Sequence, residues 1–553
     1  MNRNIKIHCV NNGKTFEVPI CSNLMDIYKA TGLNMEYGPI SAIVNNKEKS
    51  LVYECYKDKL VKFLDLTNPS ALRTYTRTVL MILCKVVSDI FPDGRIIIEN
   101  PVSKGIYCRL VIGRAITEDD IATIRTEMQK VIDANIPIER IECTTEEAIK
   151  LFEERGLMSK VKLLKSIKSV MSAYHKLGDY VDFYYGSLLP STGMVNLYAI
   201  DSYYDGLLVR TPDPKNPSKL PNIIRQDKMF KLFKEHHERQ EIFNISTIGD
   251  FNIACEQGFT SQLITVSEAI QEKKISLIAD QIVERGNVKV ILIAGPSSSG
   301  KTTFSKRLSV QLAVNGIIPI AISLDDYFVN REQTPKDEKG DYDFESLYAL
   351  DLPFFNKQLQ ELIDGKEIEI PTYNFEKGER EFKGKKIKMN ENNILVLEGI
   401  HGLNPELTSQ IPEENKFRVY VSALTSILLD EHNYIPTTDN RLLRRIIRDT
   451  KYRGCPAQET IRRWPSVRAG EDKWIFPYQE NADAMFNSAL LFELAVIRNQ
   501  AIPALINVPE NTPEYADAFR LFRFLLNIRS IEGKNLPPTS LLREFLGGSS
   551  FNY

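Results

Sequence analysis

The stretch GPSSSGKT at residues 295–302 decides the fold of the C-terminal half of this chain. It follows the apolar, β-branched run Val288–Ile293, and a helical pattern over Lys301–Val314 follows it, ended by Asn315-Gly316. A loop of small residues between a strand and a helix lets backbone N–H groups surround a phosphate, and the helix N-terminus adds partial positive charge. The order strand, loop, helix therefore predicts a nucleoside-triphosphate site.

Two side chains of this loop have predicted roles. Lys301 is expected to reach the β- and γ-phosphates of ATP, and the Thr302 hydroxyl is expected to bind Mg²⁺. A glycine-rich turn that only joins a strand to a helix is the alternative, which the register of the motif disfavours. No N-K-x-D sequence follows the loop, so a GTPase is disfavoured as well. The predicted ATP-binding residues are Gly295, Pro296, Ser297, Ser298, Ser299, Gly300, Lys301, Thr302 and Thr303.

Apolar runs recur on both sides of the loop and alternate with helical patterns. Near-continuous apolar strands between helices are typical of a parallel sheet that is covered on both faces. The sequence therefore predicts an α/β domain with such a sheet. The expected strands are Val288–Ile293, Ile317–Ser323, Ile394–Leu397, Phe417–Val421 and Ala504–Val508.

Carboxylates follow two of these strands. Asp325 and Asp326 come after the second strand, and Glu398 ends the third. The carboxyl ends of parallel strands meet at one edge of a sheet, beside the phosphate loop. Asp325 is therefore expected to orient a substrate hydroxyl and accept its proton, and Glu398 is expected to hold Mg²⁺. A solvated acidic loop is the alternative for the aspartate pair.

An arginine-rich helical pattern, DNRLLRRIIRDTKYRG, covers residues 439–454. Its arginines fall at helical spacings, so two or three of them share one face. A mobile helix of this kind could close over the phosphates and neutralise charge in the transition state. A solvated basic helix or a nucleic-acid-binding face is the alternative, and the phosphate loop upstream favours the lid.

Together these motifs resemble the uridine kinase / phosphoribulokinase family of P-loop kinases over about residues 288–508. The likeness is carried by GPSSSGKTT, SLDDYF, YDFESLYALD (342–351), IPTYNF (370–375), VLEGI and the arginine-rich segment. It implies a kinase that uses ATP and Mg²⁺ to phosphorylate the 5′-hydroxyl of a nucleoside. The catalytic residues it implies are Lys301, Asp325, Arg441, Arg444 and Arg445. The nucleoside-binding residues it implies are Asp325, Phe328, Glu345 (or Asp343), Tyr373 and Arg448.

One departure from that family leaves the acceptor open. Uridine kinases carry a histidine shortly after the tyrosine of the P-x-Y motif, whereas Tyr373 is followed here by Asn-Phe-Glu-Lys-Gly. The base preference is therefore open, and a kinase for another small hydroxyl compound, such as a sugar phosphate or a pantothenate-like acceptor, is a second hypothesis.

His401 follows Glu398 closely, and Trp474 flanks an arginine-rich stretch. Structural packing and a role at the site stay open for both side chains.

The first 230 residues resemble the N-terminal part of threonyl-tRNA synthetase. The likeness is carried by LCKVVSDIFPDG, SKGIYC, ITEDDIATIRTEM and GDYVDFYYGSLLPSTG. It implies a β-grasp TGS domain followed by an editing-type domain. The four metal-ligand positions of that editing domain fall on Arg77, Met81, Tyr184 and Leu188, which cannot bind zinc. We therefore expect a metal-free domain, and an RNA contact and a regulatory scaffold both stay open as its role.

The expected domain order joins these two resemblances. Strands at Ile5–Val10 and Thr15–Ile20 are expected to meet in a type I′ turn at Asn12-Gly13, followed by a helix over Leu24–Ala30 that Ser22 caps. The expected units are a TGS-like α+β domain at 1–66, an α+β editing-like domain at 67–230, a helical connector at 231–286, the α/β domain at 287–510, and a C-terminal helix and tail at 511–553.

Composition and charge limit the classes of partner and the cellular location that we expect for this protein. The 553 residues carry a formal net charge of −2, which gives no global reason to expect nucleic acid or an anionic membrane as partner. The 8 cysteines are scattered without a C-x-x-C pair, and His236-His237 lies in a charged helical pattern that we expect to be solvated. No apolar leader and no run of about 18 apolar residues is seen, so we expect a cytoplasmic protein without a membrane partner. Whether the protein forms a homo-oligomer stays open.

A hypothesis of another class is an RNA-binding regulator whose P-loop domain hydrolyses ATP as a switch.

Overall fold

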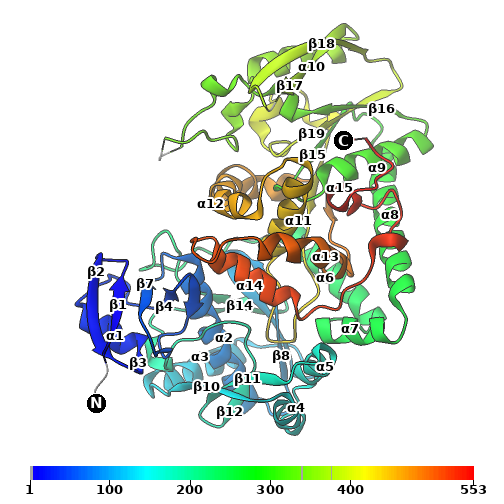
Figure 1. Ribbon diagram of the computed structural model, residues 1–553. Helices are drawn as coiled ribbons and strands as arrows, with labels where there is room; N and C mark the ends of the chain where they lie inside the picture. The colour runs from blue at the N-terminus through cyan, green and yellow to red at the C-terminus, as the bar shows by residue number, and fades with distance from the viewer. Residues whose placement is uncertain (1–3, 338–339, 375, 553) are drawn as a thin grey trace.

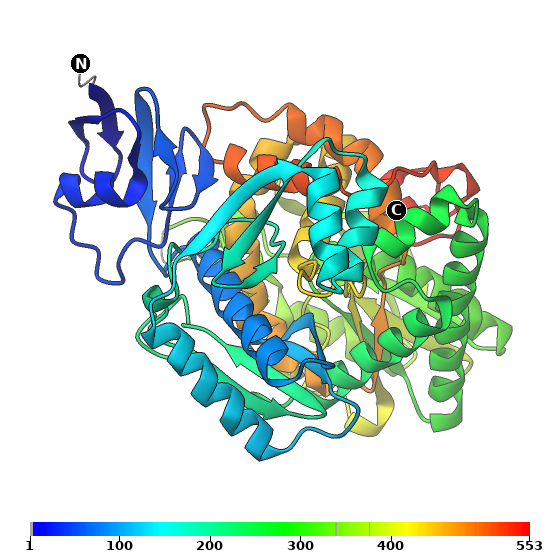
Figure 2. The same ribbon diagram turned by 90° about the horizontal axis from the view of Figure 1, so that it is seen from below.

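The computed structural model describes residues 4–337, 340–374 and 376–552, which form an N-terminal sheet, a mixed α/β region and a parallel-sheet domain (Figure 1). Phe375, part of the IPTYNF segment, lies outside the described residues. Figure 2 shows the N-terminal sheet projecting from one end of the molecule. Among the described residues, no helix is both long enough and apolar enough to cross a membrane.

The N-terminal region is a five-stranded sheet in the order β2-β1-β7-β4-β5, with one helix packed on it. β1 and β7 pair in parallel, and β1 and β2 form an antiparallel hairpin. Its elements are β1 (Asn4–Cys9), β2 (Lys14–Pro19), β3 (Ser22–Asn23), α1 (Leu24–Thr31), β4 (Ser41–Val44), β5 (Lys47–Lys49), β6 (Glu54–Cys55) and β7 (Lys59–Leu64).

Two local expectations in this region were wrong. The hairpin register pairs Cys9 with Lys14, so four residues form the loop, and of the expected type I′ pair only Gly13 has a positive φ. The Asn12 side chain accepts a hydrogen bond from the Lys14 N–H and closes this wider turn. Asn23, rather than Ser22, caps α1 by accepting from the Asp26 N–H.

The second region places a four-stranded sheet, β13-β14-β9-β8, and a three-stranded sheet, β10-β11-β12, around the long helix α2. Thr117 caps α3 through a reciprocal capping box, as its acidic first turn predicts. The elements are α2 (Pro69–Ile90), β8 (Arg95–Val102), β9 (Gly105–Val111), α3 (Glu118–Asp133), β10 (Ile138–Thr144), α4 (Thr145–Glu154), α5 (Met158–Ile167), β11 (Met171–Leu177), β12 (Tyr180–Asp182), β13 (Ala199–Tyr203) and β14 (Gly206–Arg210).

Three helices connect this region to the parallel sheet, as the sequence predicts. They are α6 (Asp227–Phe243), α7 (Ile248–Glu256) and α8 (Thr260–Arg285). α6 and α8 both pack against the parallel-sheet domain, so the connector is part of its core rather than a free linker.

The C-terminal domain is built on five parallel strands in the order β16-β19-β15-β20-β21. Its strands are β15 (Val290–Ala294), β16 (Ile318–Ser323), β19 (Asn393–Glu398), β20 (Lys416–Ser422) and β21 (Ala484–Asn487), with the hairpin β17 (Glu367–Asn374) and β18 (Glu379–Lys388) beside them. Its helices are α9 (Lys301–Val314), α10 (Leu352–Ile363), α11 (Thr437–Tyr452), α12 (Ala457–Trp474), α13 (Glu493–Ile506), α14 (Tyr515–Leu525) and α15 (Arg543–Leu546).

Alternate side chains of β15 enter different cores. Ile291 and Ile293 pack with α8 and α9 in one apolar cluster, whereas Val290 and Leu292 pack with α10 in another. Phe233 of α6 packs near the end of β15 on the second face. The central strand is thus buried on both sides, which explains its continuous apolar sequence.

The fifth strand lies elsewhere than expected. The run Ala504–Val508 lies at the end of α13, and the edge position is taken by β21, Ala484–Asn487. A strand of 4 residues is too short to show a period, and the apolar run Ala504–Val508 covers the last turn of a helix and the residues after it.

A buried ionic cluster joins the second region to the loop before α11. Lys160 of α5 donates to Asp430 at 2.7 Å and lies 2.8 Å from Asp182, and His432 Nδ1 lies 2.7 Å from Asp182. The side chain of His432 is 8% exposed, and the other three are 1% exposed or less. Burial raises the pKa of Asp182, but Lys160 and His432 lower it more, so the net shift is downward.

Replacement of Lys160 by Met is expected to destabilise the protein strongly, because two buried carboxylates lose their cation. The free energy of unfolding should fall by about 3–5 kcal/mol, measured by thermal or urea denaturation at neutral pH. Lys162, an exposed lysine of the same helix that pairs with Asp250 of α7, is the matched control, and Lys162→Met should cost about 1 kcal/mol or less. Equal effects of the two variants would contradict the role of the cluster.

The same cluster gives the sign of a pH dependence. Since the folded-state pKa of Asp182 lies below its ordinary value, this stabilisation is complete at neutral pH and is lost as the pH falls through the folded pKa.

Candidate active site

The phosphate loop connects β15 to α9 in a conformation that only small residues permit. A Cβ atom on Gly295 would lie 1.9 Å from the Val421 carbonyl oxygen, and Gly300 has a φ of +84°. Ser298 also lies in the left-handed region, with a φ of 58°. α9 begins at Lys301, so the N-terminal end of the helix faces the loop.

Lys301 curls back over this loop. Its Nζ lies 3.4 Å from the Pro296 carbonyl oxygen, and its residue is 9% exposed. An ammonium group held over a ring of backbone N–H groups provides a site for a phosphate anion.

The two predicted carboxylates end strands on the same edge of the sheet. Glu398 is in register with Ser323 of β16 and with Ile293 of β15, and Asp325 follows β16 by two residues. The carboxyl ends of three neighbouring strands thus place Lys301, Asp325 and Glu398 together, as the sequence predicts.

Asp325 lies where protein surrounds it but solvent still reaches it. Burial among protein atoms raises the pKa of its carboxyl, and the positive charges of Lys301, Arg453 and Arg448 oppose that rise. The side chain nevertheless remains accessible. A carboxylate of raised pKa that is open to a ligand suits acceptance of a proton.

Glu398 and Thr302 form the part of the site that fits a hard cation. Burial raises the pKa of Glu398 to about 7; Lys301 and a hydrogen bond from Thr302 oppose the rise. A carboxylate beside a hydroxyl is an oxygen donor set of the kind that Mg²⁺ takes, with its remaining positions filled by water or phosphate.

Two of the predicted lid arginines lie behind the loop rather than over it. Arg441 forms an ion pair with Glu471, and Arg444 forms one with Glu493, with all four side chains 1% exposed or less. Both guanidinium groups donate to backbone carbonyl oxygens of the loop. They therefore support the loop and do not face a ligand, which corrects the expectation that they close over the phosphates.

The remaining lid arginines face the site. Arg445 donates to the Ser297 hydroxyl at 2.8 Å, and the carboxylate of Asp449 is shared by Arg445, Arg448 and Arg453. Three guanidinium groups around one carboxylate leave net positive charge beside the loop. A hollow of about 310 Å³ opens here, lined by Arg445, Asp449, Arg453, Gly454, Cys455, Thr460 and Arg463.

Three other predicted substrate-binding residues, Phe328, Tyr373 and Glu345, lie outside α11. The rings of Phe328 and Tyr373 are 5.5 Å apart and largely buried, and Asp326 accepts a hydrogen bond from the Tyr373 N–H. Burial raises the pKa of Glu345, against the charges of Arg445 and Lys301. Glu345 is thus close enough to Lys301 of the phosphate loop and to Arg445 of α11 for their charges to shift its pKa.

The C-terminal segment contacts the loop, which the sequence did not predict. Glu544 of α15 accepts hydrogen bonds from the Thr303 N–H at 3.3 Å and from its hydroxyl at 2.7 Å. Leu541 lies so close to Gly300 that an added Cβ would come within 2.4 Å of it. A carboxylate therefore lies beside the first turn of α9, 241 residues away in the sequence.

The four editing-type ligand positions lie in a packed core. Met81, Tyr184 and Leu188 are at most 3% exposed, and the Arg77 guanidinium donates to the Ser187 carbonyl oxygen. None of these side chains can bind zinc, as expected.

A buried group of possible ligand atoms lies close to these positions. Cys84, Asp182 and His432 bring one such atom each within 4.8 Å of one another. Lys160 already supplies the positive charge beside Asp182, so this group is balanced without a metal ion.

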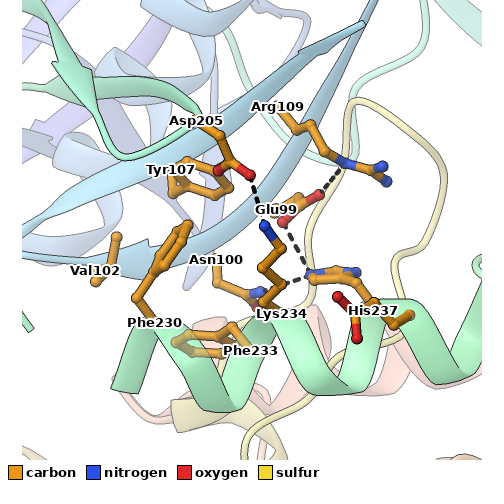
Figure 3. Close-up of a pocket in the computed structure, with 11 residues that line it drawn as sticks. Glu99, Asn100, Val102, Tyr107, Arg109, Asp205, Phe230, Phe233, Lys234 and His237 are labelled. Carbon is orange, nitrogen blue, oxygen red and sulfur yellow. Dashed lines mark hydrogen bonds and ion pairs between the residues drawn. The ribbon is translucent and has the colours of Figure 1, made fainter. Parts of the chain in front are cut away.

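A second hollow, of about 230 Å³, lies between the four-stranded sheet and α6 (Figure 3). The buried carboxylate of Glu99 lies 2.8 Å from Arg109 and 2.9 Å from His237, and Lys234 pairs with Asp205. These contacts of Glu99 with His237 and of Asp205 with Lys234 tie α6 to the sheet. His237 belongs to this network, which corrects the expectation of a solvated histidine pair.

The C-terminal domain matches a known family of kinases. Residues 290–491 match the model of the phosphoribulokinase / uridine kinase family. Among solved structures, a possible uridine kinase from Bacillus stearothermophilus is 18% identical, covers 39% of this chain and 98% of its own, and has a TM-score of 0.28. D-glycerate 3-kinase from Cryptococcus neoformans is 14% identical, covers 48% of this chain and 92% of its own, and has a TM-score of 0.21.

The N-terminal half is similar to threonine–tRNA ligases. The ligase of Syntrophomonas wolfei is 27% identical over 195 residues, which are 35% of this chain and 31% of the ligase. The ligase of Clostridium kluyveri is 29% identical over 185 residues, which are 33% of this chain and 29% of the ligase. The chain thus spans less than a third of the length of these relatives.

Proposed function

We propose that this chain, whose residues 290–491 form a domain of the phosphoribulokinase / uridine kinase family, transfers the γ-phosphate of ATP to the 5′-hydroxyl of a nucleoside. The observation that carries the proposal is the convergence of Lys301, Asp325 and Glu398 at the carboxyl edge of three neighbouring parallel strands. A cation for phosphate, a proton acceptor and a metal ligand are the three groups that phosphoryl transfer to a hydroxyl needs.

The phosphate loop and two arginines of α11, Arg445 and Arg448, act on the phosphate groups. Backbone N–H groups of residues 295–302 and Lys301 hold the β- and γ-phosphates, and Arg445 and Arg448 stabilise charge on the transferring group. Mg²⁺, held by Thr302 and Glu398, would neutralise part of the phosphate charge. Arg441 and Arg444 are positioning residues, since they bind the loop itself.

Asp325 and the residues near it act on the phosphate acceptor. Asp325 orients the acceptor hydroxyl towards the γ-phosphate and accepts its proton as the new P–O bond forms. Phe328 and Tyr373 supply an apolar wall, and Glu345 accepts hydrogen bonds from acceptor hydroxyls. A desolvated carboxyl with raised pKa is suited to Asp325's task, because it accepts a proton more readily than a free aspartate.

The direct test is an ADP-release assay with Mg-ATP against ribonucleosides, deoxynucleosides, polyols and phosphorylated sugars, with products identified by mass. A nucleoside monophosphate as the product of the fastest acceptor supports the proposal. A different phosphorylated compound would keep the kinase and replace the acceptor.

The similarity to threonine–tRNA ligases gives the N-terminal half a second candidate role, contact with RNA. In that case the P-loop domain would hydrolyse ATP as a switch. ADP formation that depends on tRNA and yields no phosphorylated small molecule would favour this role over the kinase. A fall of tRNA affinity with added salt would mark the contact as electrostatic.

Substitution of Asp325 by Asn is expected to lower kcat by about 10²–10⁴-fold, since the amide cannot accept the hydroxyl proton. The KM for ATP should change little. The neighbouring Asp326→Asn is the matched control, because an amide oxygen can still accept the hydrogen bond from Tyr373, and its kcat should fall less than about tenfold. Near-normal turnover of Asp325→Asn would exclude this residue as the base.

Removal of the negative charge of Glu544 is expected to tighten ATP binding. The Glu544→Gln variant keeps an acceptor for Thr303 but no longer repels phosphate, so the KM for ATP should fall by about two- to tenfold. Glu532→Gln, which changes an exposed carboxylate of the same tail, is the control. An unchanged or higher KM for ATP in Glu544→Gln would show that the contact does not oppose nucleotide.

A further inference from the structure

Three segments far apart in the sequence meet beside the proposed acceptor position. His401 lies three residues after Glu398, in the turn that follows β19, and Glu345 lies in the segment after the β16 loop. Trp474 ends α12, and its ring lies 6.3 Å from that of His401 in an edge-on arrangement. The pKa values of Glu345 and His401 are both affected by the charge of Lys301, which places the two side chains near the phosphate loop.

Each of these segments contributes a buried polar atom without a hydrogen-bond partner. They are Oε2 of Glu345, one ring nitrogen of His401, whose other nitrogen faces the Ser346 backbone, and Nε1 of Trp474. His401 is 2% exposed, so its nitrogens do not reach bulk solvent. Buried polar atoms are almost always hydrogen-bonded in folded proteins, and leaving them unpaired costs free energy. Three such atoms on segments that pack against one another point to a ligand that supplies their partners.

The chemistry of these atoms limits what the ligand can be. Burial lowers the pKa of His401 to about 4, against a hydrogen bond to the Ser346 backbone that raises it, so the ring is neutral and its other nitrogen offers an acceptor. Trp474 offers a donor, and Glu345 offers an acceptor. Arg445 adds positive charge near Glu345, but its guanidinium and that of Arg448 are paired with Asp449 on the lid helix. The acceptor atoms of Glu345 and His401 disfavour an anion here. The set therefore matches neutral hydroxyl, amide or ring-nitrogen groups and not a phosphate.

Close packing holds this arrangement in place. Gly470 of α12 packs against Glu345, and a Cβ atom there would lie 2.3 Å from Glu345 Cβ. Trp474 follows Gly470 by one helical turn, and its other side meets Tyr348, with ring centroids 5.9 Å apart. The polar atoms are thus presented by side chains that have little freedom to turn away and find other partners.

We propose that His401 and Trp474, together with Glu345, form a subsite that recognises neutral hydrogen-bonding groups of the phosphate acceptor, and that the enzyme therefore selects an uncharged, polyhydroxylated acceptor such as a nucleoside over a phosphorylated sugar. This proposal rests on the phosphotransferase function proposed above.

The test compares His401→Ala, His401→Gln and Trp474→Phe with the unchanged protein in steady-state kinetics with the fastest neutral acceptor. The KM for the acceptor should rise at least tenfold in His401→Ala and Trp474→Phe, while the KM for ATP stays within about twofold. His401→Gln keeps a donor and an acceptor and should recover part of the loss. His8→Ala, an exposed histidine of the N-terminal sheet, is the matched control and should leave both constants unchanged.

Equal rises in the KM for ATP and for the acceptor would overturn the proposal, because they would indicate a purely structural role. An unchanged acceptor KM in both His401 variants would overturn it as well, since the remaining ring nitrogen would then bind only water. Preference of the unchanged protein for a phosphorylated sugar would also overturn it. If a neutral polyol rather than a nucleoside is the best acceptor and the variants behave as expected, the subsite stands and only the nucleoside assignment fails.

Discussion

The placement of α11 by two buried ion pairs is the constraint on which the site depends. Arg441 Nε donates to the Ser297 carbonyl oxygen at 3.0 Å, and Arg444 Nη1 donates to that of Ser298 at 3.3 Å, while Glu471 and Glu493 balance their charges. A buried guanidinium without its carboxylate would be very costly, so the loop, α11, α12 and α13 are tied to one geometry. The arginines thus fix the loop through its carbonyl oxygens, and Glu471 also accepts a hydrogen bond from the Ser297 N–H at 3.1 Å.

The same helix connects the two halves of the chain. The loop before α11 enters the second region, where Asp430 and His432 complete the charge balance of Lys160 and Asp182. Backbone hydrogen bonds continue this contact, for example from the Ile98 N–H to the Glu431 carbonyl oxygen. A change in the threonine–tRNA-ligase-like half would thus reach the phosphate loop through a short and rigid route. The loop at residues 430–433 is thus held by Lys160, Asp182 and the backbone at Phe183 and Tyr185.

Sequence patterns predicted those features whose causes are local. The strand, loop and helix around Lys301 follow from hydrophobic pattern, small residues and the stop at Asn315-Gly316, and the structure places α9 at Lys301–Val314. The same holds for the carboxylates, because the end of a parallel strand fixes which edge a residue occupies. Features with distant causes were missed. Whether an arginine of α11 faces a ligand depends on Glu471 and Glu493, which lie 30 and 49 residues away.

The contact of Glu544 with Thr303 spans 241 residues, and the pattern of the tail contains nothing that indicates it. The edge strand β21 was missed for another reason, since 4 residues cannot display a period of two convincingly. Local rules therefore located the chemistry of the site, whereas the division of the arginines between support and ligand contact required the three-dimensional packing.

We propose that the P-loop domain transfers phosphate to a small acceptor rather than releasing it to water. The stoichiometry of ADP to phosphorylated acceptor, followed by mass spectrometry during a single time course with Mg-ATP and the best acceptor, tests it most directly. If phosphate passes to the acceptor, ADP and the phosphorylated acceptor should form in equal amounts at every time point. ADP that accumulates together with inorganic phosphate, and without a phosphorylated acceptor, would contradict it.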